Sequence, residues 1–278
     1  MVTRRDDAFV ELSVPEAYER FMGSQLFEPW ARELVRRAAP RRGGSALDVA
    51  TGPGTVARIM AHEIGDGGRC VASDISPAML ALASARPAAM GSAPIEYLEC
   101  SATALACADE SFELVVCQQG LQFIPDRLAA LREIHRVLVR GGEVYVSTWA
   151  AEQPLGLFGP MADTMRESGM HEPYPRAFDG ASYVIAAADL HALLTRAGFG
   201  DIEVATVGLD CIWRPATDAV CAVAGTPYGP LLASLPAEQH ERVLRTLRER
   251  LGGRDETELA IRTTSNIARA KKDAAATA

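Results

Sequence analysis

Short apolar runs alternate with amphipathic stretches along the first half of the chain. The apolar runs have the length of buried strands, and the stretches between them carry apolar residues at helical spacing. We therefore predict strands at residues 46–50, 70–75, 95–100, 112–117 and 143–149. Helices are predicted at residues 27–39, 55–64, 76–82 and 127–139. Regular alternation of the two kinds of element predicts a mainly parallel sheet with helices on both faces.

This rhythm changes after residue 150. Residues 151–188 are rich in Gly, Pro, Met and aromatic side chains and have weak periodicity, which indicates an insertion or lid. Beyond it we predict helices at 187–197, 216–224 and 237–251 and strands at 202–213 and 258–271. The fold class is therefore α/β with a seven-stranded sheet. We expect one domain over residues 1–278, divided into an N-terminal helical cover (1–40), a ligand-binding core (41–150), the lid (151–188) and a part that completes the sheet (189–278).

Composition narrows the classes of function. The formal net charge of −8 disfavours nucleic acid and anionic membranes as partners. The polar start and the absence of a long apolar run predict a cytoplasmic protein. Six cysteines without a Cys-x-x-Cys pair favour buried free thiols over disulfides or a metal site. The only lysines are Lys271 and Lys272, which excludes a P-loop and the Tyr-x-x-x-Lys pair of short-chain dehydrogenases.

Polar groups follow the first two predicted strands. Asp48 precedes a turn that contains Gly52 and Gly54, and Asp74 ends the next strand, 20 residues after Gly54. An acid at that position can bind both hydroxyls of a ribose. Ser76 already caps the following helix, so we expect Asp74 to be free for a ligand. Asp48 would repel a pyrophosphate but attract a sulfonium with an ammonium group, which favours S-adenosylmethionine (SAM) over NAD. The alternatives are a plain strand-to-helix turn for the two glycines, a helix cap for Asp74 and a purely structural role for Asp48.

Four segments resemble the motifs of class I SAM-dependent methyltransferases, which have a Rossmann-like fold. They are Leu47-Asp-Val-Ala-Thr-Gly-Pro-Gly54, Val71-Ala-Ser-Asp-Ile-Ser-Pro-Ala-Met79, Ala108-Asp-Glu-Ser-Phe-Glu-Leu-Val-Val-Cys117 and Glu133-Ile-His-Arg-Val-Leu-Val-Arg-Gly-Gly142. Within the class the chain is most similar to the methyltransferase type 11 group, which includes ubiquinone/menaquinone C-methyltransferases. The resemblance covers roughly residues 15–150.

The resemblance implies SAM as the cofactor and assigns residues to its parts. Asp74 would bind the ribose, Ile75 and Met79 would flank the adenine, and Ser101 with Ala102 would meet the adenine amino group. The remaining cofactor residues that we predict are Tyr18, Phe21 and Met22 at the methionine end, Asp48, Ala50, Thr51, Gly52 and Gly54 at the turn, and Gln118 and Gln119. The chain departs from the family at two positions, because Ala50 replaces a glycine and Ser101 replaces a common aspartate.

Residues 118–123 follow the predicted strand at 112–117 and carry several amide side chains. This position lies beside the place expected for the methyl group of the cofactor. We predict that Gln122 and Phe123 contact the methyl acceptor, although a polar loop is the alternative. Aromatic Trp213 and Tyr228 are further acceptor candidates, with core packing as their alternative. In the lid, His171 is the first candidate for a general base and Tyr174 is the second; both are also assigned to the acceptor site. A surface-loop role for His171 remains the alternative.

The predicted function is transfer of a methyl group from SAM to a small, aromatic, natural-product or quinone-like acceptor. O-, N- and C-methylation stay open, and we expect a monomer or homodimer. Three other functions are kept: an NAD(P)-dependent Rossmann oxidoreductase, a catalytically silent ligand-binding protein, and a methyltransferase that acts on RNA or protein. Asp48 and the missing Tyr-x-x-x-Lys pair disfavour the first, and the acidic charge disfavours the last.

Overall fold

The computed structural model describes residues 13–153, 156–170, 184–252 and 257–273. The chain forms two compact units. The helical unit comprises residues 1–29, 153–177 and 208–264, and the sheet unit comprises residues 30–152, 178–207 and 265–278. Strands β6 and β7 contribute residues to both units. The expected division into cover, core, lid and C-terminal part stays a prediction.

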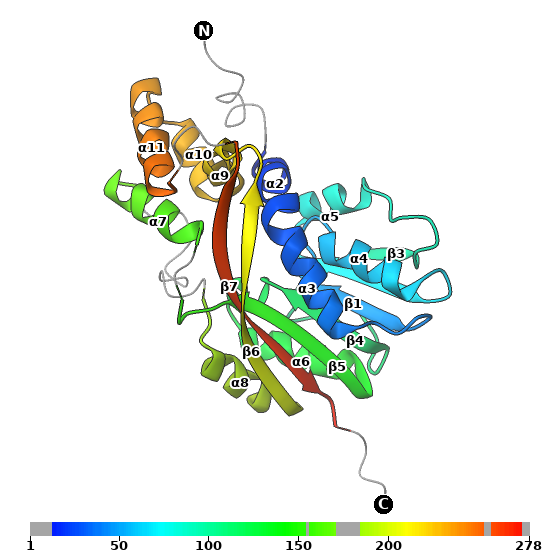
Figure 1. The fold of residues 1–278 in the computed structure, drawn as a ribbon. Coiled ribbons are helices and arrows are strands. Elements are labelled where there is room, and N and C mark those ends of the chain that lie inside the picture. Colours follow the sequence, from blue (N-terminus) through cyan, green and yellow to red (C-terminus); the bar gives the residue numbers. More distant parts are fainter. Residues whose placement is uncertain (1–12, 154–155, 171–183, 253–256, 274–278) are drawn as a thin grey trace, which may run out of the picture. The chain divides into compact units, whose positions relative to one another are not determined.

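Seven strands form one sheet in the order β3-β2-β1-β4-β5-β7-β6 (Figure 1). The pairs β3-β2, β2-β1, β1-β4 and β4-β5 are parallel, whereas β7 runs antiparallel to β5. The strands are β1 (Ser45–Val49), β2 (Arg69–Asp74), β3 (Ile95–Glu99), β4 (Phe112–Gln118), β5 (Leu138–Trp149), β6 (Gly200–Trp213) and β7 (Leu259–Lys271). This mixed sheet, with helices around it, confirms the predicted Rossmann-like α/β fold class.

Helices cover the sheet where its strands are most apolar. Along β1 the side chains from Ala46 to Val49 are all buried, as expected for a strand that is covered on both faces. On one face, Leu131 and Leu194 pack into the same apolar cluster as Val144. The helices of this unit are α3 (Glu28–Ala38, which begins in the helical unit), α4 (Thr55–Ile64), α5 (Pro77–Ser84), α6 (Arg127–Val137) and α8 (Ala187–Arg196). Most predicted helix and strand ends are right to within a residue or two.

The start of β5 differs from the prediction. We expected Gly141 and Gly142 to close a helix that ends at residue 139, but α6 ends at Val137 and β5 begins at Leu138. The pairing of β4 with β5 shifts register across this stretch. Gly141 has a φ of +78° and donates its N–H to the Lys272 carbonyl over 2.8 Å. The two glycines therefore form an irregular stretch within the strand, because their backbone reaches across to the end of β7.

The helical unit contains helices at the predicted segments 216–224 and 237–251, together with further helices whose bounds were not predicted. Its elements are α2 (Val14–Tyr18), the π-helix η1 (Glu19–Phe27), α7 (Phe158–Glu167), α9 (Thr217–Cys221), the 3-10 helix η3 (Ala222–Gly225), α10 (Tyr228–Ala233) and α11 (Ala237–Arg250). A Cβ atom on Gly225 would lie 2.4 Å from Tyr18 Cα, so η3 packs directly on the backbone of α2. Ser13 is the N-cap of α2, and Glu16 completes a capping box.

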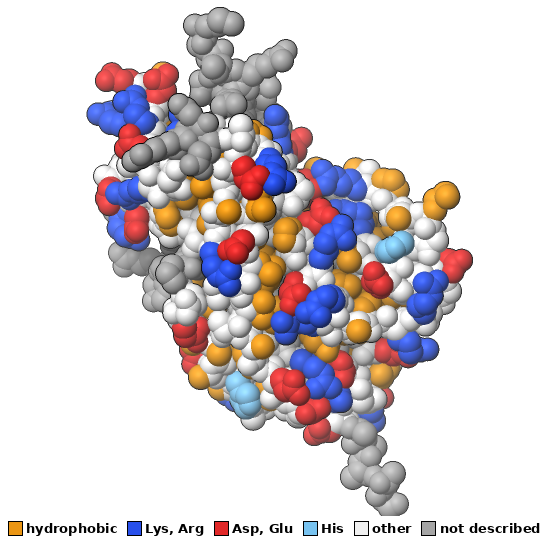
Figure 2. Space-filling view, in the orientation of Figure 1, with side chains coloured by type: hydrophobic (Ala, Val, Ile, Leu, Met, Phe, Trp, Pro, Cys, Tyr) orange, Lys and Arg blue, Asp and Glu red, His pale blue; other side chains and the backbone are white. Residues whose placement is uncertain are grey.

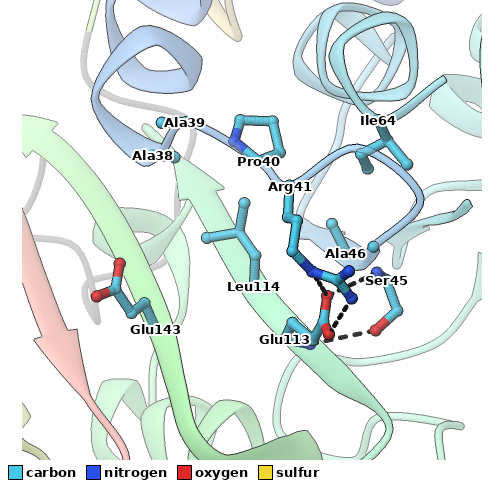
Figure 3. A pocket seen from close by; sticks show the side chains of 11 residues that line it. Ala38, Ala39, Pro40, Arg41, Ser45, Ala46, Ile64, Glu113, Leu114 and Glu143 are labelled. Carbon is cyan, nitrogen blue, oxygen red and sulfur yellow. Dashed lines mark hydrogen bonds and ion pairs between the residues drawn. The ribbon is translucent and has the colours of Figure 1, made fainter.

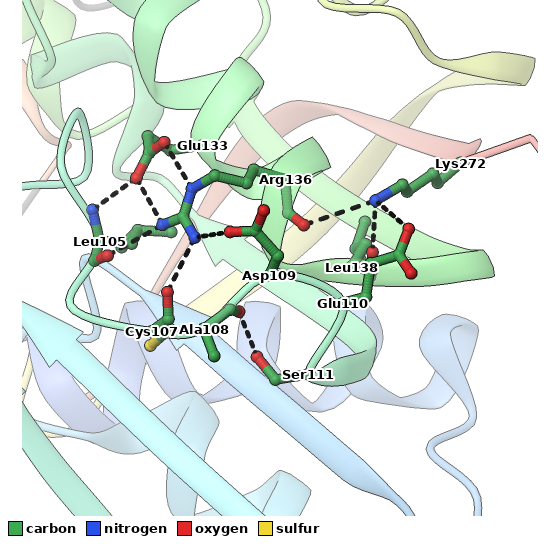
Figure 4. A network of polar contacts seen from close by, with 10 residues as sticks. All are labelled: Leu105, Cys107, Ala108, Asp109, Glu110, Ser111, Glu133, Arg136, Leu138 and Lys272. Carbon is green, nitrogen blue, oxygen red and sulfur yellow. Dashed lines mark hydrogen bonds and ion pairs between the residues drawn. The ribbon is translucent and has the colours of Figure 1, made fainter.

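Arg136 of α6 fixes the loop between β3 and β4 (Figure 4). Its guanidinium donates to the Cys107 carbonyl at 2.8 Å, the Leu105 carbonyl at 3.0 Å and Asp109 at 2.6 Å. Glu133 binds the same guanidinium and also accepts the Leu105 N–H at 2.8 Å. The carboxylates raise the pKa of Arg136, so the clamp is charged. This network holds the loop that begins with the predicted adenine contacts.

Acidic and basic side chains are interspersed on the face that Figure 2 shows, over the parts that the structure describes. Ion pairs at the surface of the described residues include Arg36–Glu33 and Arg69–Glu96. The six cysteines are free thiols; four of them are buried, as predicted, whereas Cys100 and Cys107 are half-buried. Burial raises the pKa of Cys117 to about 12, which keeps that thiol protonated and unreactive at neutral pH.

Candidate functional site

The turn after β1 has the left-handed backbone that glycine favours. Gly52 has a φ of +55° and Gly54 a φ of +78°. A Cβ on Gly54 would lie 2.9 Å from the Cβ of Ala83, so this glycine allows α4 to begin close against α5. By contrast, apart from Gly52 itself and its two chain neighbours, no described residue has an atom within 4 Å of the place that a Cβ on Gly52 would occupy. The two glycines therefore have different surroundings: Gly54 packs against α5, whereas the position of a Cβ on Gly52 is open.

Asp74 ends β2 beside this turn, but it is not free as expected. Its Oδ2 accepts the Gly52 N–H at 2.8 Å, and its Oδ1 accepts the Ser76 N–H at 2.9 Å. Ser76 does cap α5, as predicted, because its hydroxyl accepts the Met79 N–H. The two backbone amides orient the carboxylate, and each oxygen keeps a second lone pair for a ligand hydroxyl.

Asp48 is a buried acid directly beneath the turn. Only 1% of its surface is exposed, and its Oδ2 accepts the Thr51 hydroxyl over 2.5 Å. By distance and angle its Oδ1 makes no hydrogen bond among the residues that the structure describes, although the Ala57 backbone N–H is near enough to lower the pKa of the carboxyl. Burial raises the pKa of Asp48 to about 7, against the lowering effect of the Thr51 hydroxyl. A cation bound nearby would stabilise the ionised form of this group, whereas a pyrophosphate would oppose it.

Two residues that are not glycine adopt left-handed backbone at the ends of neighbouring strands. Ala50, after β1, has a φ of +57°, and Gln119, after β4, has a φ of +50°. A Cβ on Gly120 would lie 2.7 Å from the Ala50 Cβ, so the two loops are in close contact. Such backbone is strained for residues with a Cβ and tends to occur at functional sites. Ala50 thus adopts the left-handed backbone that glycine favours, and its methyl group packs on Gly120.

The predicted adenine contacts lie at the carboxyl ends of β2 and β3. Ile75 is 72% exposed, which is unusual for a large apolar side chain and fits an uncovered ligand-facing surface. Met79 is half-buried in the first turn of α5. The Ser101 hydroxyl is within 2.8 Å of the Thr103 hydroxyl and accepts the Thr103 N–H, so it is engaged in a local turn. Ala102 follows it in the same loop.

A chain of hydrogen bonds connects the glutamines after β4 to β7. Gln122 Nε2 donates to Gln119 Oε1 at 3.4 Å, and Gln119 Nε2 donates to the Ser265 hydroxyl at 2.7 Å. All three side chains are buried. Sequence reasoning found both glutamines but missed Ser265. The available signal was the polar run Thr263–Asn266 inside a strand that is otherwise apolar at its buried positions.

Several predicted site residues belong to the helical unit. Phe21 and Met22 of η1 are buried, and Tyr18 stacks on Phe27 with ring centroids 4.6 Å apart. Trp213 is fully buried and donates its indole N–H to the Phe21 carbonyl over 3.0 Å, so it packs in the core of that unit. Tyr228 begins α10. The ligand contacts of these residues stay predictions. His171 and Tyr174 lie outside the described residues.

The residues at the carboxyl ends of the strands fit an adenosyl cofactor with a positive charge. Asp74 presents oriented carboxylate oxygens, Gly52 borders open space and Ile75 offers an apolar surface. The buried Asp48 carboxyl, whose Oδ1 has no partner among the described residues, can ionise to balance the charge of a sulfonium and an ammonium group. Phe123 is 43% exposed beyond the glutamines. These groups together therefore suit SAM better than a dinucleotide.

A separate pocket of about 190 Å³ lies at the amino ends of strands β1 and β4 (Figure 3). The residues at the start of β1 and β4 line it, together with the segment that follows α3. Its main carboxylate, Glu113, is paired with Arg41 and also accepts the Ser45 N–H. Because ligands of open α/β sheets bind at the carboxyl ends of the strands, this pocket is not the candidate site.

Neither a membrane span nor a metal centre emerges from the described residues. No helix there is long and apolar enough to cross a bilayer. No group of three or more His, Cys, Asp or Glu side chains is arranged there to hold a metal ion.

The sequence has recognisable relatives. The sequence model of the ubiE/COQ5 methyltransferase family matches residues 13–154. The ubiquinone/menaquinone biosynthesis C-methyltransferase UbiE of Xanthomonas campestris is 35% identical over 143 residues, which cover 51% of this chain and 56% of that protein. The chain thus spans about half the length of the curated relatives it matches.

Solved structures share the fold. Phosphoethanolamine N-methyltransferase 2 of Haemonchus contortus, determined with S-adenosyl-L-methionine, has a TM-score of 0.60 and 20% identity; the match covers 98% of this chain and 60% of that one. The YcgJ protein of Bacillus subtilis has a TM-score of 0.57 and 14% identity, with 87% and 97% covered. At such identities the likeness establishes the fold alone.

Proposed function

The chain belongs to the ubiE/COQ5 methyltransferase family, and we propose that it transfers a methyl group from SAM to a small acceptor molecule. The observation that carries this proposal is the arrangement of two carboxylates around one glycine turn. Asp74 accepts the Gly52 N–H beside the turn, and Asp48 is buried beneath it with one oxygen lacking a partner among the described residues. A ribose and a cation satisfy these two groups, and a pyrophosphate does not.

Each part of this arrangement has a chemical task. When bound, SAM would supply a methyl group on a sulfonium. The neutral thioether that leaves needs no proton from the protein. The chain contributes alignment of the reactants and exclusion of water. Asp74 binds and orients the ribose hydroxyls, Asp48 balances the positive charge, and Ile75 with Met79 flanks the adenine.

The acceptor that we propose is small, aromatic and quinone-like. Two observations support this: the relative from Xanthomonas campestris is a ubiquinone/menaquinone biosynthesis C-methyltransferase, and Phe123 offers an exposed ring beside buried amides. Where the acceptor must lose a proton, His171 is our first candidate for the base and Tyr174 the second. A base is needed for a phenol or an alcohol, and only at a later step for an electron-rich ring carbon.

The two glycines provide a paired prediction. Gly54→Ala should lower the free energy of unfolding by about 2–4 kcal/mol, because left-handed strain adds to the clash with Ala83. Gly52→Ala should cost only about 1–2 kcal/mol of stability, from strain alone. It should nevertheless weaken SAM binding, because its methyl group enters the open space at the turn. Urea unfolding and calorimetric titration with SAM measure both effects; equal losses of stability would contradict this division of roles.

Binding of cofactors tests the function directly. We expect SAM and its product S-adenosylhomocysteine to raise the melting temperature of the protein and NADH to leave it unchanged. Transfer of a labelled methyl group to a panel of phenols, naphthols and quinols should then identify acceptors. Stabilisation by NADH alone would overturn the proposal in favour of an oxidoreductase. SAM binding without turnover on any acceptor would favour a silent binding protein.

A further inference from the structure

Arg58 of α4 binds the backbone of the glycine turn. Its Nη1 donates to the carbonyl of Pro53, the residue between Gly52 and Gly54, over 2.7 Å. The same nitrogen lies 3.0 Å from the place that a Cβ on Gly54 would occupy, next to the Ala83 side chain. The Cβ position of Gly52 has no such neighbour among the described residues. The guanidinium therefore lies on the packed side of the turn and leaves the open side to a ligand.

The charge of Arg58 acts on the buried carboxyl of Asp48. It lowers the pKa of Asp48, whereas the negative charge of Asp74 raises it. Asp48 and Asp74 are the two carboxyl groups of the candidate site, so Arg58 is the cation that offsets them. With Asp48 ionised, two carboxylates and one guanidinium leave a single negative charge in excess. SAM carries a sulfonium, an ammonium and one carboxylate, so its net positive charge balances that excess.

The other titratable groups that face Asp48 lie on the neighbouring strands and are neutral. They are Cys70 on β2, Tyr97 on β3 and Cys117 on β4. Burial raises the pKa of each side chain, and the negative charge of Asp48 adds to the rise. These groups are therefore protonated near neutral pH, and none of them can replace Arg58 as a source of positive charge.

We propose that Arg58 is a positioning residue of the cofactor site: the Pro53 carbonyl fixes its guanidinium, and its charge keeps Asp48 ionised so that this carboxylate holds the positive end of SAM. Arg58 thus acts through Asp48 rather than on the cofactor. This inference rests on the proposed function, since it concerns the SAM site of the same methyltransferase. It adds a residue of α4 to the groups at the strand ends.

The dependence of SAM affinity on pH tests this role. Calorimetric titration gives the dissociation constant of SAM at several pH values around the Asp48 pKa of about 7. Arg58→Met removes the positive charge, so the rise in affinity should move upward by about 0.5–1 pH unit. Near neutral pH the variant should then bind SAM about three- to tenfold more weakly than the wild type. Arg58→Lys keeps the charge and should return the midpoint to within about 0.3 pH unit of the wild-type value.

S-Adenosylhomocysteine separates this electrostatic role from a structural one, because it lacks the sulfonium charge. Its affinity should change by about twofold or less in Arg58→Met. Arg58→Gln is a second neutral variant, whose amide can still donate to the Pro53 carbonyl. It should shift the SAM profile in the same direction, which keeps the test valid if Arg58→Met does not fold. Arg132→Met changes an exposed arginine of α6 and should leave the profile of the wild type.

Three results bear against the inference or its premise. An unchanged midpoint in the neutral variants, or an equal loss of affinity for SAM and S-adenosylhomocysteine at every pH, would overturn the inference alone. A wild-type affinity for SAM that does not vary with pH would also overturn the inference while the proposed function stands. Failure of the wild-type protein to bind SAM would overturn the proposed function and, with it, the inference.

Discussion

Replacing Asp74 by alanine should weaken the binding of SAM by roughly 100-fold or more. The carboxylate would accept two ribose hydroxyls, and a hydrogen bond to a charged group contributes about 1.5–3 kcal/mol. Because each 1.4 kcal/mol changes an affinity about tenfold, the loss of both bonds reaches at least two orders of magnitude. Calorimetric titration of the variant with SAM measures the change.

Asp74 also holds the backbone of the turn, so its removal needs a control for general loss of structure. Glu113 is a suitable partner, because it too accepts a backbone N–H, from Ser45, but at the opposite edge of the sheet. Glu113→Ala should lose some stability while it binds SAM as the wild-type protein does. If both variants lost affinity to the same extent, Asp74 would be a structural residue and its assignment to the ribose would be wrong.

Local patterns predicted most of the fold because most of its determinants are local. The strand β1, the glycine turn and α4 follow one another within a short segment, so apolar spacing and turn chemistry locate them. The Ser76 cap of α5 was predicted for the same reason. The π-helix η1 was not predicted, since its backbone pattern leaves no distinctive spacing of apolar residues. Gly141 and Gly142 misled the prediction, because their role depends on Lys272 far along the chain.

The residues of the candidate site were likewise predicted where their determinants are local and missed where they depend on distant parts of the chain. Asp48, Gly52 and Asp74 lie at the ends of successive parallel strands, so their spacing alone indicated that they meet. That Asp74 is bound by two backbone amides was not predictable from spacing, because it depends on the path of the turn. Ser265 comes from a strand inserted between β5 and β6 and reaches Gln119 only through tertiary pairing. No pattern near residue 119 indicates that partner.

Asp48 should make both stability and SAM affinity depend on pH. Its pKa in the folded protein is raised to about 7 by burial, above the value of an unfolded aspartate. Its contribution to stability is therefore fully present below the unfolded pKa and is lost as pH rises through about 7. The cofactor-free protein should melt at lower temperature at pH 8 than at pH 6. Bound SAM favours the ionised form, so its affinity should rise over the same interval, by at most about tenfold per pH unit.

Asp48→Asn provides the decisive comparison, because asparagine keeps the shape of the side chain and an oxygen for the Thr51 hydroxyl. This variant should melt at a temperature that changes little between pH 6 and pH 8, and its SAM affinity should be lower than wild type at pH 8 and nearly independent of pH. Asp126→Asn serves as the matched control, since Asp126 is an exposed N-cap of α6 and asparagine caps a helix equally well. It should retain the wild-type pH profile in both melting and titration. Persistence of that profile in Asp48→Asn would show that another group titrates, and the buried carboxylate would then have no part in binding the positive charge of SAM.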